Sequence, residues 1–301
     1  MTESDKIKQF ALTLGFDACG ICRAESSGEE ANLRNWISMN YQGDMSYLER
    51  NIEKRDDPRL LVPGAKSIIS VALNYYPNEK RDTSLPKFAY YAYGKDYHYV
   101  VKEKLRQLFN YIKSIYPDTE GRYFCDTAPV LEGYWAVKAG LGFVGKNTLL
   151  IIPGKGSFFF LGELIINKEL DYDEPINLSC GTCTRCLDAC PTGAIEQPHL
   201  VNATRCISYQ TIEKKGAQDN DVSTSDWVYG CDVCQLICPW NRFSKPHTTP
   251  EFNPSPEFLS LDLFALQTMD KEKFSSLFSK SAIKRAKLKG LQRNVRQLTK
   301  K

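Results

Sequence analysis

The sequence predicts an α+β protein that ends in a helical segment, and three observations lead to that class. Residues 1–170 mix helix-period segments with strand-like runs, residues 171–250 hold a cysteine-rich module, and residues 251–301 carry helix-period apolar residues among basic ones. A chain of 301 residues can fill one large domain or two ordinary ones. We therefore expect three consecutive regions with these boundaries.

The composition is that of a soluble globular protein, with 42% hydrophobic and 25% charged residues. The most apolar runs, TLLII and FFFLGELII, are strand-length and far short of the ~18 residues of a membrane span. The start of the chain, MTESDKIKQFALTLG, carries acids and lacks the pattern of a signal peptide. We therefore expect a cytoplasmic protein without membrane contact, whose cysteines are ligands rather than disulfides.

The net charge of +3 is unevenly distributed along the chain. Residues 281–301 hold eight Lys or Arg and no acid. Such a segment is either a solvated helix or an arm for a polyanion, meaning nucleic acid or anionic lipid.

The first region opens with a predicted helix, in which Ile7, Phe10, Ala11 and Leu14 recur at helical spacing. We expect Ser4 as its N-cap and Gly15 as its stop. The stretches at 64–76 and 157–170 predict buried strands, because they are β-branched and aromatic between turn signals.

A longer helix is predicted after Asp96, which can cap it, and Pro117 ends it. The stretch RYFC (122–125) predicts a short strand. A second helix is expected through LEGYWAVKAG, with Pro129 in its first turn. The segments SPEFLSLDLFAL and KFSSLFSKSAIKRAKLKGL predict helices in the third region.

The cysteine module contains one complete ferredoxin motif and one that lacks a ligand. SCGTCTRCLDACP (179–191) has the full C-x2-C-x2-C-x3-C-P run, and GCDVCQLICPW (230–240) has only C-x2-C-x3-C-P. In two-cluster ferredoxins the fourth cysteine of each run ligates the other cluster. On that rule Cys180, Cys183, Cys186 and Cys238 hold one 4Fe–4S cluster.

The second cluster then needs Cys190, Cys231, Cys234 and one more thiolate. Cys206 is the remaining candidate within the module, so the missing ligand lies about 25 residues upstream. Zinc is the rival metal, but its sites typically use paired C-x2-C hairpins rather than triplets followed by C-x3-C-P. Eight thiolates therefore predict two clusters, which can pass single electrons.

No familiar cofactor loop precedes the module. The glycine-rich stretch AGLGFVGKN (139–147) follows a helix, which weakens a phosphate-cradle interpretation. The chain has three histidines, and they are scattered, which disfavours a histidine-ligated mononuclear metal.

Six stretches nevertheless resemble one family in order along most of the chain. They are IEKRDDPRLLVPGAKSIISVALNYY, YGKDYHYVVKEKL, CDTAPVLEGYWAVKAGLGFVGKNTLLI, CGTCTRCLDACPTGAI, GCDVCQLICPWN and SAIKRAKLKGLQRN. Together they resemble the epoxyqueuosine reductases. The resemblance implies an oxidoreductase that uses cobalamin and two 4Fe–4S clusters to reduce epoxyqueuosine to queuosine at the wobble position of tRNA, the last step of queuosine biosynthesis. It also implies an N-terminal domain similar to the cobalamin-binding domain of reductive dehalogenases, followed by a ferredoxin-like module.

The resemblance also assigns residues. Asp126 matches the proposed proton donor, and Lys214 and Lys215 match positions near the tRNA. The positions that match cobalamin contacts are Arg55, Asp126, Asn147, Leu150, Leu161, Ser208, Cys231 and Asp232.

Asp126 poses a problem of acidity. A helix start at Pro129 would favour its carboxylate and lower its pKa, whereas an acid at neutral pH needs a raised pKa. We expect burial beneath a corrin and a nucleoside to raise the pKa of Asp126 if the pocket is dry. The alternative is that Asp126 is a simple N-cap. Cys19, Cys22 and Cys125 are interpreted as packing thiols, His98 as structural, and the tyrosines of residues 90–99 as either core-edge or stacking groups.

Two other functions remain open: a cobalamin reductase of a small molecule such as an organohalide, or a pure electron carrier. Besides tRNA, we expect one further partner, an external low-potential electron donor. We expect the chain to be a monomer. Many family members continue past RNVRQL into stacked helical repeats, where this chain stops, so part of the usual tRNA surface is in doubt.

Overall fold

The computed structural model describes residues 2–219 and 222–298, and its centre is a four-stranded antiparallel sheet. The strand order is β1 (Ala18–Arg23), β2 (Ser67–Asn74), β7 (Phe159–Ile166) and β4 (Gly121–Phe124). β2 is buried along its whole length because helices cover both faces of the sheet. The strands expected at 64–76, 122–125 and 157–170 are thereby confirmed.

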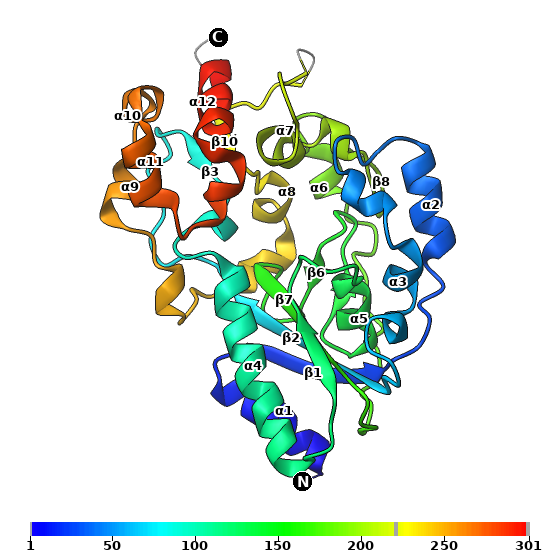
Figure 1. Ribbon diagram of the computed structural model, residues 1–301. Coiled ribbons are helices and arrows are strands. Elements are labelled where there is room, and N and C mark those ends of the chain that lie inside the picture. Colours follow the sequence, from blue (N-terminus) through cyan, green and yellow to red (C-terminus); the bar gives the residue numbers. More distant parts are fainter. Residues whose placement is uncertain (1, 220–221, 299–301) are drawn as a thin grey trace.

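Helices α1 (Glu3–Thr13) and α4 (Tyr97–Ile115) cover one face of the sheet, and α5 (Glu132–Lys138) covers the other (Figure 1). Side chains that alternate along β7 point to opposite faces, so Leu164 joins the core under α4 while Ile165 joins the core under α5. Asp96 caps α4, because its Oδ1 accepts a hydrogen bond from the amide of His98 at 3.0 Å.

Two predicted helix starts are wrong. Thr2, not Ser4, caps α1, and the Thr2 hydroxyl accepts from the Asp5 amide while the Asp5 carboxylate accepts from the Thr2 amide. Ser4 lies inside the helix, where its Oγ accepts from the amide of Asp171. Helix α5 begins at Glu132, so Pro129 precedes it in a loop.

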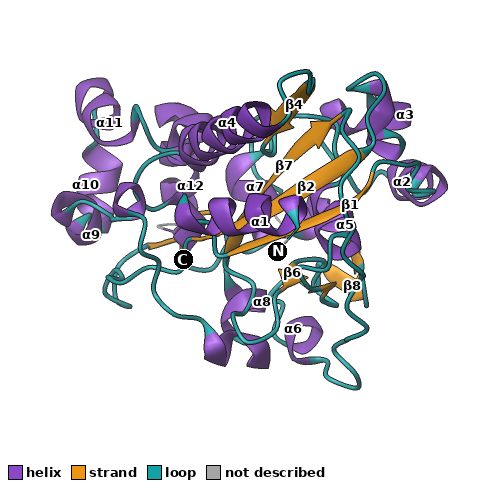
Figure 2. Ribbon diagram, turned by 90° about the horizontal axis from the view of Figure 1, so that it is seen from below, coloured by secondary structure: helices purple, strands orange, loops and turns teal. Residues whose placement is uncertain are grey.

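The cysteine module is built from short elements. Helices α6 (Arg185–Asp188) and α8 (Val233–Leu236) lie side by side (Figure 2). The remaining elements here are α7 (Ile207–Ile212), β5 (Phe143–Val144) paired with β6 (Leu150–Ile151), β8 (Ile195–Gln197) paired with β9 (Leu200–Val201), and β10 (Trp227–Tyr229). Strand β10 pairs in parallel with β3 (Lys87–Phe88), which ties the module to the first region.

The helical prediction for the third region is confirmed, in several pieces. α9 (Pro256–Ser260), α10 (Leu263–Thr268), α11 (Lys271–Phe278) and α12 (Lys287–Leu298) pack around a core that they share with β3 and β10. They lie at the opposite side of the molecule from α2 (Glu30–Ser38) and α3 (Ile52–Asp56) (Figures 1 and 2). None of the helices described is long and apolar enough to cross a membrane.

Short 3-10 helices connect these elements. They are Ser46–Glu49, Pro58–Leu60, Tyr90–Ala92, Ala203–Arg205, Pro239–Phe243, Pro250–Phe252 and Ala282–Ala286.

Candidate active site and cluster module

The eight cysteines of the module gather in two quartets. Burial raises the pKa of the Cys186 thiol, and the nearby thiols of Cys180, Cys238 and Cys183 raise it further. Burial likewise raises the pKa of Cys234 to about 12, with contributions from Cys206 and Cys190 among its neighbours. The second quartet is completed by Cys231, whose pKa is raised by burial and then by Cys206 and Cys234. These are the two sets into which the motif spacing divides the cysteines.

The donor set fits iron–sulfur clusters. Thiolates are the ordinary cluster ligands, and backbone amides commonly donate to their sulfurs. The Ala194 amide donates to Cys190 Sγ at 3.3 Å. Burial alone would raise the pKa of Cys190, but the amides around it lower the pKa below its usual value. Within the described ranges, no group of three or more His, Cys, Asp or Glu side chains is arranged to hold a single metal ion.

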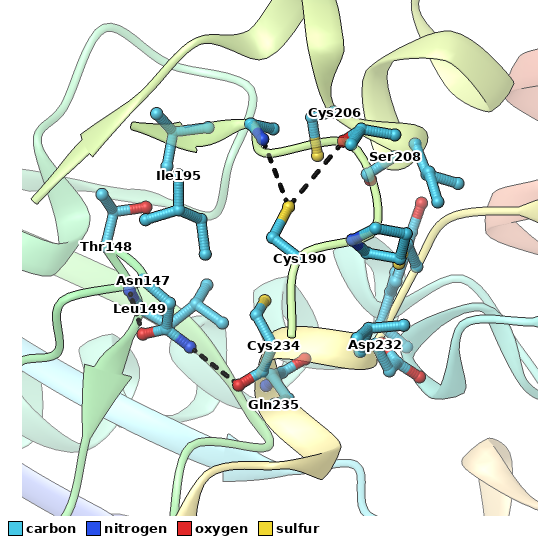
Figure 3. A pocket seen from close by; sticks show the side chains of 18 of the residues that line it. Asn147, Thr148, Leu149, Cys190, Ile195, Cys206, Ser208, Asp232, Cys234 and Gln235 are labelled. Atoms are coloured by element: carbon cyan, nitrogen blue, oxygen red, sulfur yellow. Dashed lines mark hydrogen bonds between the residues drawn. The ribbon is translucent and has the colours of Figure 1, made fainter. Parts of the chain in front are cut away.

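A cavity of about 280 Å³ adjoins the second quartet. Figure 3 shows Cys190, Cys206 and Cys234 around it, with Asn147 beside Cys234 and Thr148 next to Asn147. Asn147 is held there because its Nδ2 donates to the carbonyl of Cys234 at 3.4 Å. The lining is mostly apolar, and Asn147 is one of the few polar side chains that interrupt it.

Asp232 lies at the bottom of this cavity and is 2% exposed. Its Oδ2 accepts from the amide of Tyr90 at 2.7 Å, and burial raises its pKa to about 7. Ser208 lines this cavity and the next. Leu150 packs in the core under α5 while its neighbour Leu149 lines the cavity, and Leu161 packs against the same core.

Two larger cavities, of about 700 and 620 Å³, lie beyond the first. The 700 Å³ cavity shares Tyr91 and Ser208 with the cavity beside the second quartet. Asp126, Tyr47 and Arg285 line both large cavities. We call these three cavities together the cleft. Asp126 lines the two larger ones.

Asp126 is held by two residues from the start of α4. The Tyr97 hydroxyl donates to Asp126 Oδ2 at 2.5 Å, and His98 Nε2 lies 3.2 Å from the same oxygen. On its other side His98 Nδ1 contacts Asp96 Oδ1 at 2.7 Å. The Tyr97 ring is fixed by stacking on Phe160, with ring centroids 4.2 Å apart. The Asp126 side chain is 54% exposed, and this exposure is toward the cleft.

With its side chain 54% exposed, Asp126 does not show the raised pKa that a dry pocket would give. Burial does act upward, but the hydrogen bonds from His98 and Tyr97 and the charge of His98 outweigh it and lower the pKa. Burial acts downward on His98, yet its contacts with Asp126 and Asp96 raise its pKa to about 9. At neutral pH the proton of this pair therefore resides on His98. His98 is part of the site rather than a structural residue.

The other predicted residues lie around the cleft. Arg55, in α3, lines the 620 Å³ cavity; its Nε is buried and finds no hydrogen-bond partner within the described chain. Lys214 Nζ pairs with Asp219 at 2.8 Å, and Lys215 is exposed. A hollow of about 300 Å³ is lined by five basic residues: Lys214, Lys215, Arg285, Lys287 and Arg293.

Sequence reasoning singled out neither Glu132 nor Arg285, and it grouped Tyr97 with the tyrosines of residues 90–99 without a role at Asp126. Tyr97 and His98 follow the predicted cap Asp96 directly, which was the available signal. Arg285 was visible only as one charge in a basic segment. Cys19 and Cys22, by contrast, are free thiols whose pKa values burial raises to about 12, which makes them poor nucleophiles.

Comparisons with known proteins show which protein family this chain resembles. The family model described as Epoxyqueuosine reductase QueG, DUF1730, matches residues 55–127, and the 4Fe-4S double cluster binding domain matches residues 179–241. The epoxyqueuosine reductase of Cellulophaga algicola is 50% identical over 295 residues, which cover 97% of this chain and 96% of that protein.

Solved structures agree. A crystal structure of epoxyqueuosine reductase with an epoxyqueuosine-modified tRNA-Tyr stem loop superposes with a TM-score of 0.89 and 34% identity, covering 98% of this chain and 80% of that chain. The Bacillus subtilis enzyme, in a form whose catalytic aspartate loop is swung out of the active site, gives 0.87 and 34%, with the same coverage. A reductive dehalogenase gives 0.53 at 18% identity, covering 98% and 37%, and shares the fold alone.

Fold and site together define an iron–sulfur oxidoreductase, in which two thiolate quartets adjoin a cleft that holds a carboxylate–imidazole pair. Identity of 50% over nearly the full length of a relative is far above what a shared fold requires. The chain belongs to the epoxyqueuosine reductase family.

Proposed function

We propose that this chain reduces the epoxide of epoxyqueuosine in tRNA to the alkene of queuosine, the last step of queuosine biosynthesis. The observation that carries the proposal is the Asp126–His98 pair, which faces a cleft that adjoins the second thiol quartet. The solved relative bound to an epoxyqueuosine-modified stem loop supports the same substrate.

Two kinds of cofactor fit the residues present. Cys180, Cys183, Cys186 and Cys238 would hold one 4Fe–4S cluster, and Cys190, Cys206, Cys231 and Cys234 the other. Asn147, Ser208, Asp232 and the unpartnered Arg55 Nε would hold cobalamin by its polar edge. When bound, cobalamin supplies a cobalt ion that can accept electrons singly and react with carbon as a two-electron nucleophile.

The protein's own residues manage the protons. Removal of the epoxide oxygen as water takes two protons, and both end on the same oxygen. An alkoxide is a poor leaving group near pH 7, so an acid must meet that oxygen as the C–O bond breaks. Asp126 faces the cleft, while His98, 3.2 Å away, carries the proton at neutral pH. We infer that Asp126 passes protons to the oxygen and that His98 refills it.

The finer assignments follow from this reading. Residues 1–170 form the catalytic region, 171–250 the two-cluster module and 251–301 a helical segment. The basic hollow with Lys214, Lys215 and Arg285 contacts phosphates of the tRNA. Electrons enter from an external low-potential donor, and the protein acts as a cytoplasmic monomer.

The test is anaerobic incubation of cluster- and cobalamin-loaded protein with tRNA bearing the epoxide, followed by mass analysis of the nucleosides. We expect loss of one oxygen and appearance of queuosine. Unchanged epoxyqueuosine with both cofactors intact would refute the proposal, and turnover of an organohalide instead would indicate the small-molecule reductase. Protein that retains no corrin would indicate an electron carrier.

A further inference from the structure

A buried carboxyl group stands in the middle of the central sheet. Glu163 lies on β7 opposite Ser70 of β2 and Phe124 of β4, and it is 0% exposed. No hydrogen-bond donor in the part of the chain described reaches either carboxyl oxygen of Glu163, and Ser70 Oγ has no partner there. An unpaired buried carboxylate is very costly, so burial favours the neutral form of Glu163.

Glu163 points to the face of the sheet that α5 covers, because Leu161 and Ile165, two residues away on either side, pack there. Glu132, the first residue of α5, is its partner on that helix. Burial raises the pKa of Glu163 well above its usual range, and the negative charge of Glu132 raises it further. Burial also raises the pKa of Glu132 to about 8, with Asp126 as the next contribution.

Glu132 also reaches the loop that carries Asp126. Its Oε1 accepts a hydrogen bond from the backbone amide of Asp126. Asp126 has a φ of 58°, in the left-handed region that costs a non-glycine residue roughly 1 kcal/mol or more. The loop is tightened further by the Thr127 amide, which donates to the Cys125 carbonyl at 2.6 Å. The strained conformation therefore needs an acceptor at Glu132.

We propose that Glu163 and Glu132 share a proton and act as a pair that positions the Asp126 loop with its carboxyl in the cleft. Glu163 provides the hydrogen, Glu132 accepts it, and Glu132 also accepts the Asp126 amide. The role of Asp126 as acid rests on the proposed function; the shared proton and the loop support do not.

Other ionisable groups surround the pair. Asp126 and His98 act on Glu132 with opposite signs, and Cys125 and Cys22 lie close enough for Glu163 to raise their thiol pKa values. Once the pair loses its proton, the carboxylates of Glu132, Glu163 and Asp126 repel one another. The loop should then lose its support as pH rises through about 8, below the pKa of His98 at about 9.

The first experiment does not depend on turnover. Infrared difference spectra between wild type and Glu163→Gln should show the loss of a protonated carboxyl band, whereas Glu103→Gln, on the exposed face of α4, should remove none. Hydrogen exchange at residues 123–131 should be faster in Glu132→Ala than in Glu132→Gln, because the amide side chain keeps an acceptor. A missing carboxyl band, or equal exchange in both variants, would overturn the proposal.

Activity then tests the consequence for the acid. We expect Glu132→Ala to lower kcat about 10-fold or more with KM for the stem loop little changed, and Glu132→Gln to restore most of it. Glu163→Gln should shift the alkaline fall of the pH–activity profile to higher pH, because the remaining fall is then that of His98. An alkaline fall of activity at the same pH in Glu163→Gln as in wild type would contradict the shared proton. If wild type shows the infrared band but reduces no epoxyqueuosine, only the proposed function fails.

Discussion

The Asp126 carboxyl takes its properties from residues at the start of α4. Tyr97 and His98 both contact Asp126 Oδ2, and Asp96 holds the far side of the imidazole. The result is a carboxylate with a lowered pKa beside a histidine with a raised one. A carboxylate of this kind serves as an acid only because a protonated neighbour can refill it.

Asp126→Asn should retain both clusters and cobalamin but lose about 10²-fold or more of turnover, because the amide cannot pass a proton. Single-turnover conversion of the modified stem loop measures this, with the exposed Asp118→Asn as control. Wild-type turnover in Asp126→Asn would remove the acid role.

His98 should make stability depend on pH. Its pKa is about 9 in the folded protein and 6.5 unperturbed, so its contribution is complete below 6.5 and is lost as pH rises through 9. In His98→Gln the urea midpoint should therefore fall less between pH 6 and pH 9 than in wild type. The exposed His199→Gln should follow wild type. Equal losses in wild type and His98→Gln would contradict the raised pKa.

At the scale of elements, α12 holds the segment that follows α7 against the cysteine module. Asn294 is 0% exposed, and its Nδ2 donates to the carbonyls of Thr211 in α7 and Val228 in β10, at 2.7 and 2.8 Å. Arg293 donates to the carbonyls of Gln210, Lys214 and Gly216. One turn of α12 thus holds the segment that carries Lys214 and Lys215.

Asn294→Ala should lower the free energy of unfolding by about 2–4 kcal/mol, because two buried carbonyls lose their donor. Urea unfolding under anaerobic conditions measures the change. Lys289→Ala, exposed on the same helix, should change it by less than about 0.5 kcal/mol. Equal stability of the two variants would mean that the Asn294 hydrogen bonds contribute nothing.

At the scale of the whole molecule, charge and apolar surface separate into two areas. The basic hollow lies at the edge of the cleft, since Arg285 lines both. Leu178, Leu236, Ile237 and Phe243, which lie within a few residues of first-quartet cysteines in the sequence, are exposed. Lys146 Nζ donates to the Gly181 carbonyl, and Arg185 and Arg242 are exposed. We expect these exposed basic side chains to steer an acidic electron donor toward the first quartet by charge.

Lys215→Ala combined with Lys287→Ala should weaken stem-loop binding and reduce its salt dependence by about one to two counterions, equally for modified and unmodified loops. Titration at several salt concentrations tests this. A loss confined to the modified loop would instead mean that these lysines read the base.

Arg185→Glu with Arg242→Glu should slow cluster reduction by an acidic protein donor about 10-fold at low salt, because the steering charge is reversed. Reduction by dithionite should stay unchanged. A control pair, Lys113→Glu with Lys271→Glu, lies on α4 and α11 and should leave both rates alone. Slowing with dithionite as well would point to cluster damage rather than docking.

Some helix starts and one strand pairing could not be predicted from local sequence signals. Both Thr2 and Ser4 are good caps, and Ser4 is drawn into the helix because its hydroxyl serves the Asp171 amide far along the chain. Pro129 suits a first turn, but the left-handed Asp126 and the Glu132 acceptor move the start of α5 to Glu132. The pairing of β3 with β10 joins residues about 140 positions apart, beyond any local pattern.

The sequence by itself determined the long helix after Asp96, the central strands, and the two sets of thiols, because helical period, strand composition and cysteine spacing are local properties. Only the tertiary structure decided the ionisation of Asp126 and the placement of Glu163 under Glu132. The pKa of a buried group depends on which distant side chains fold around it, and here those neighbours come from α4, α5 and β7.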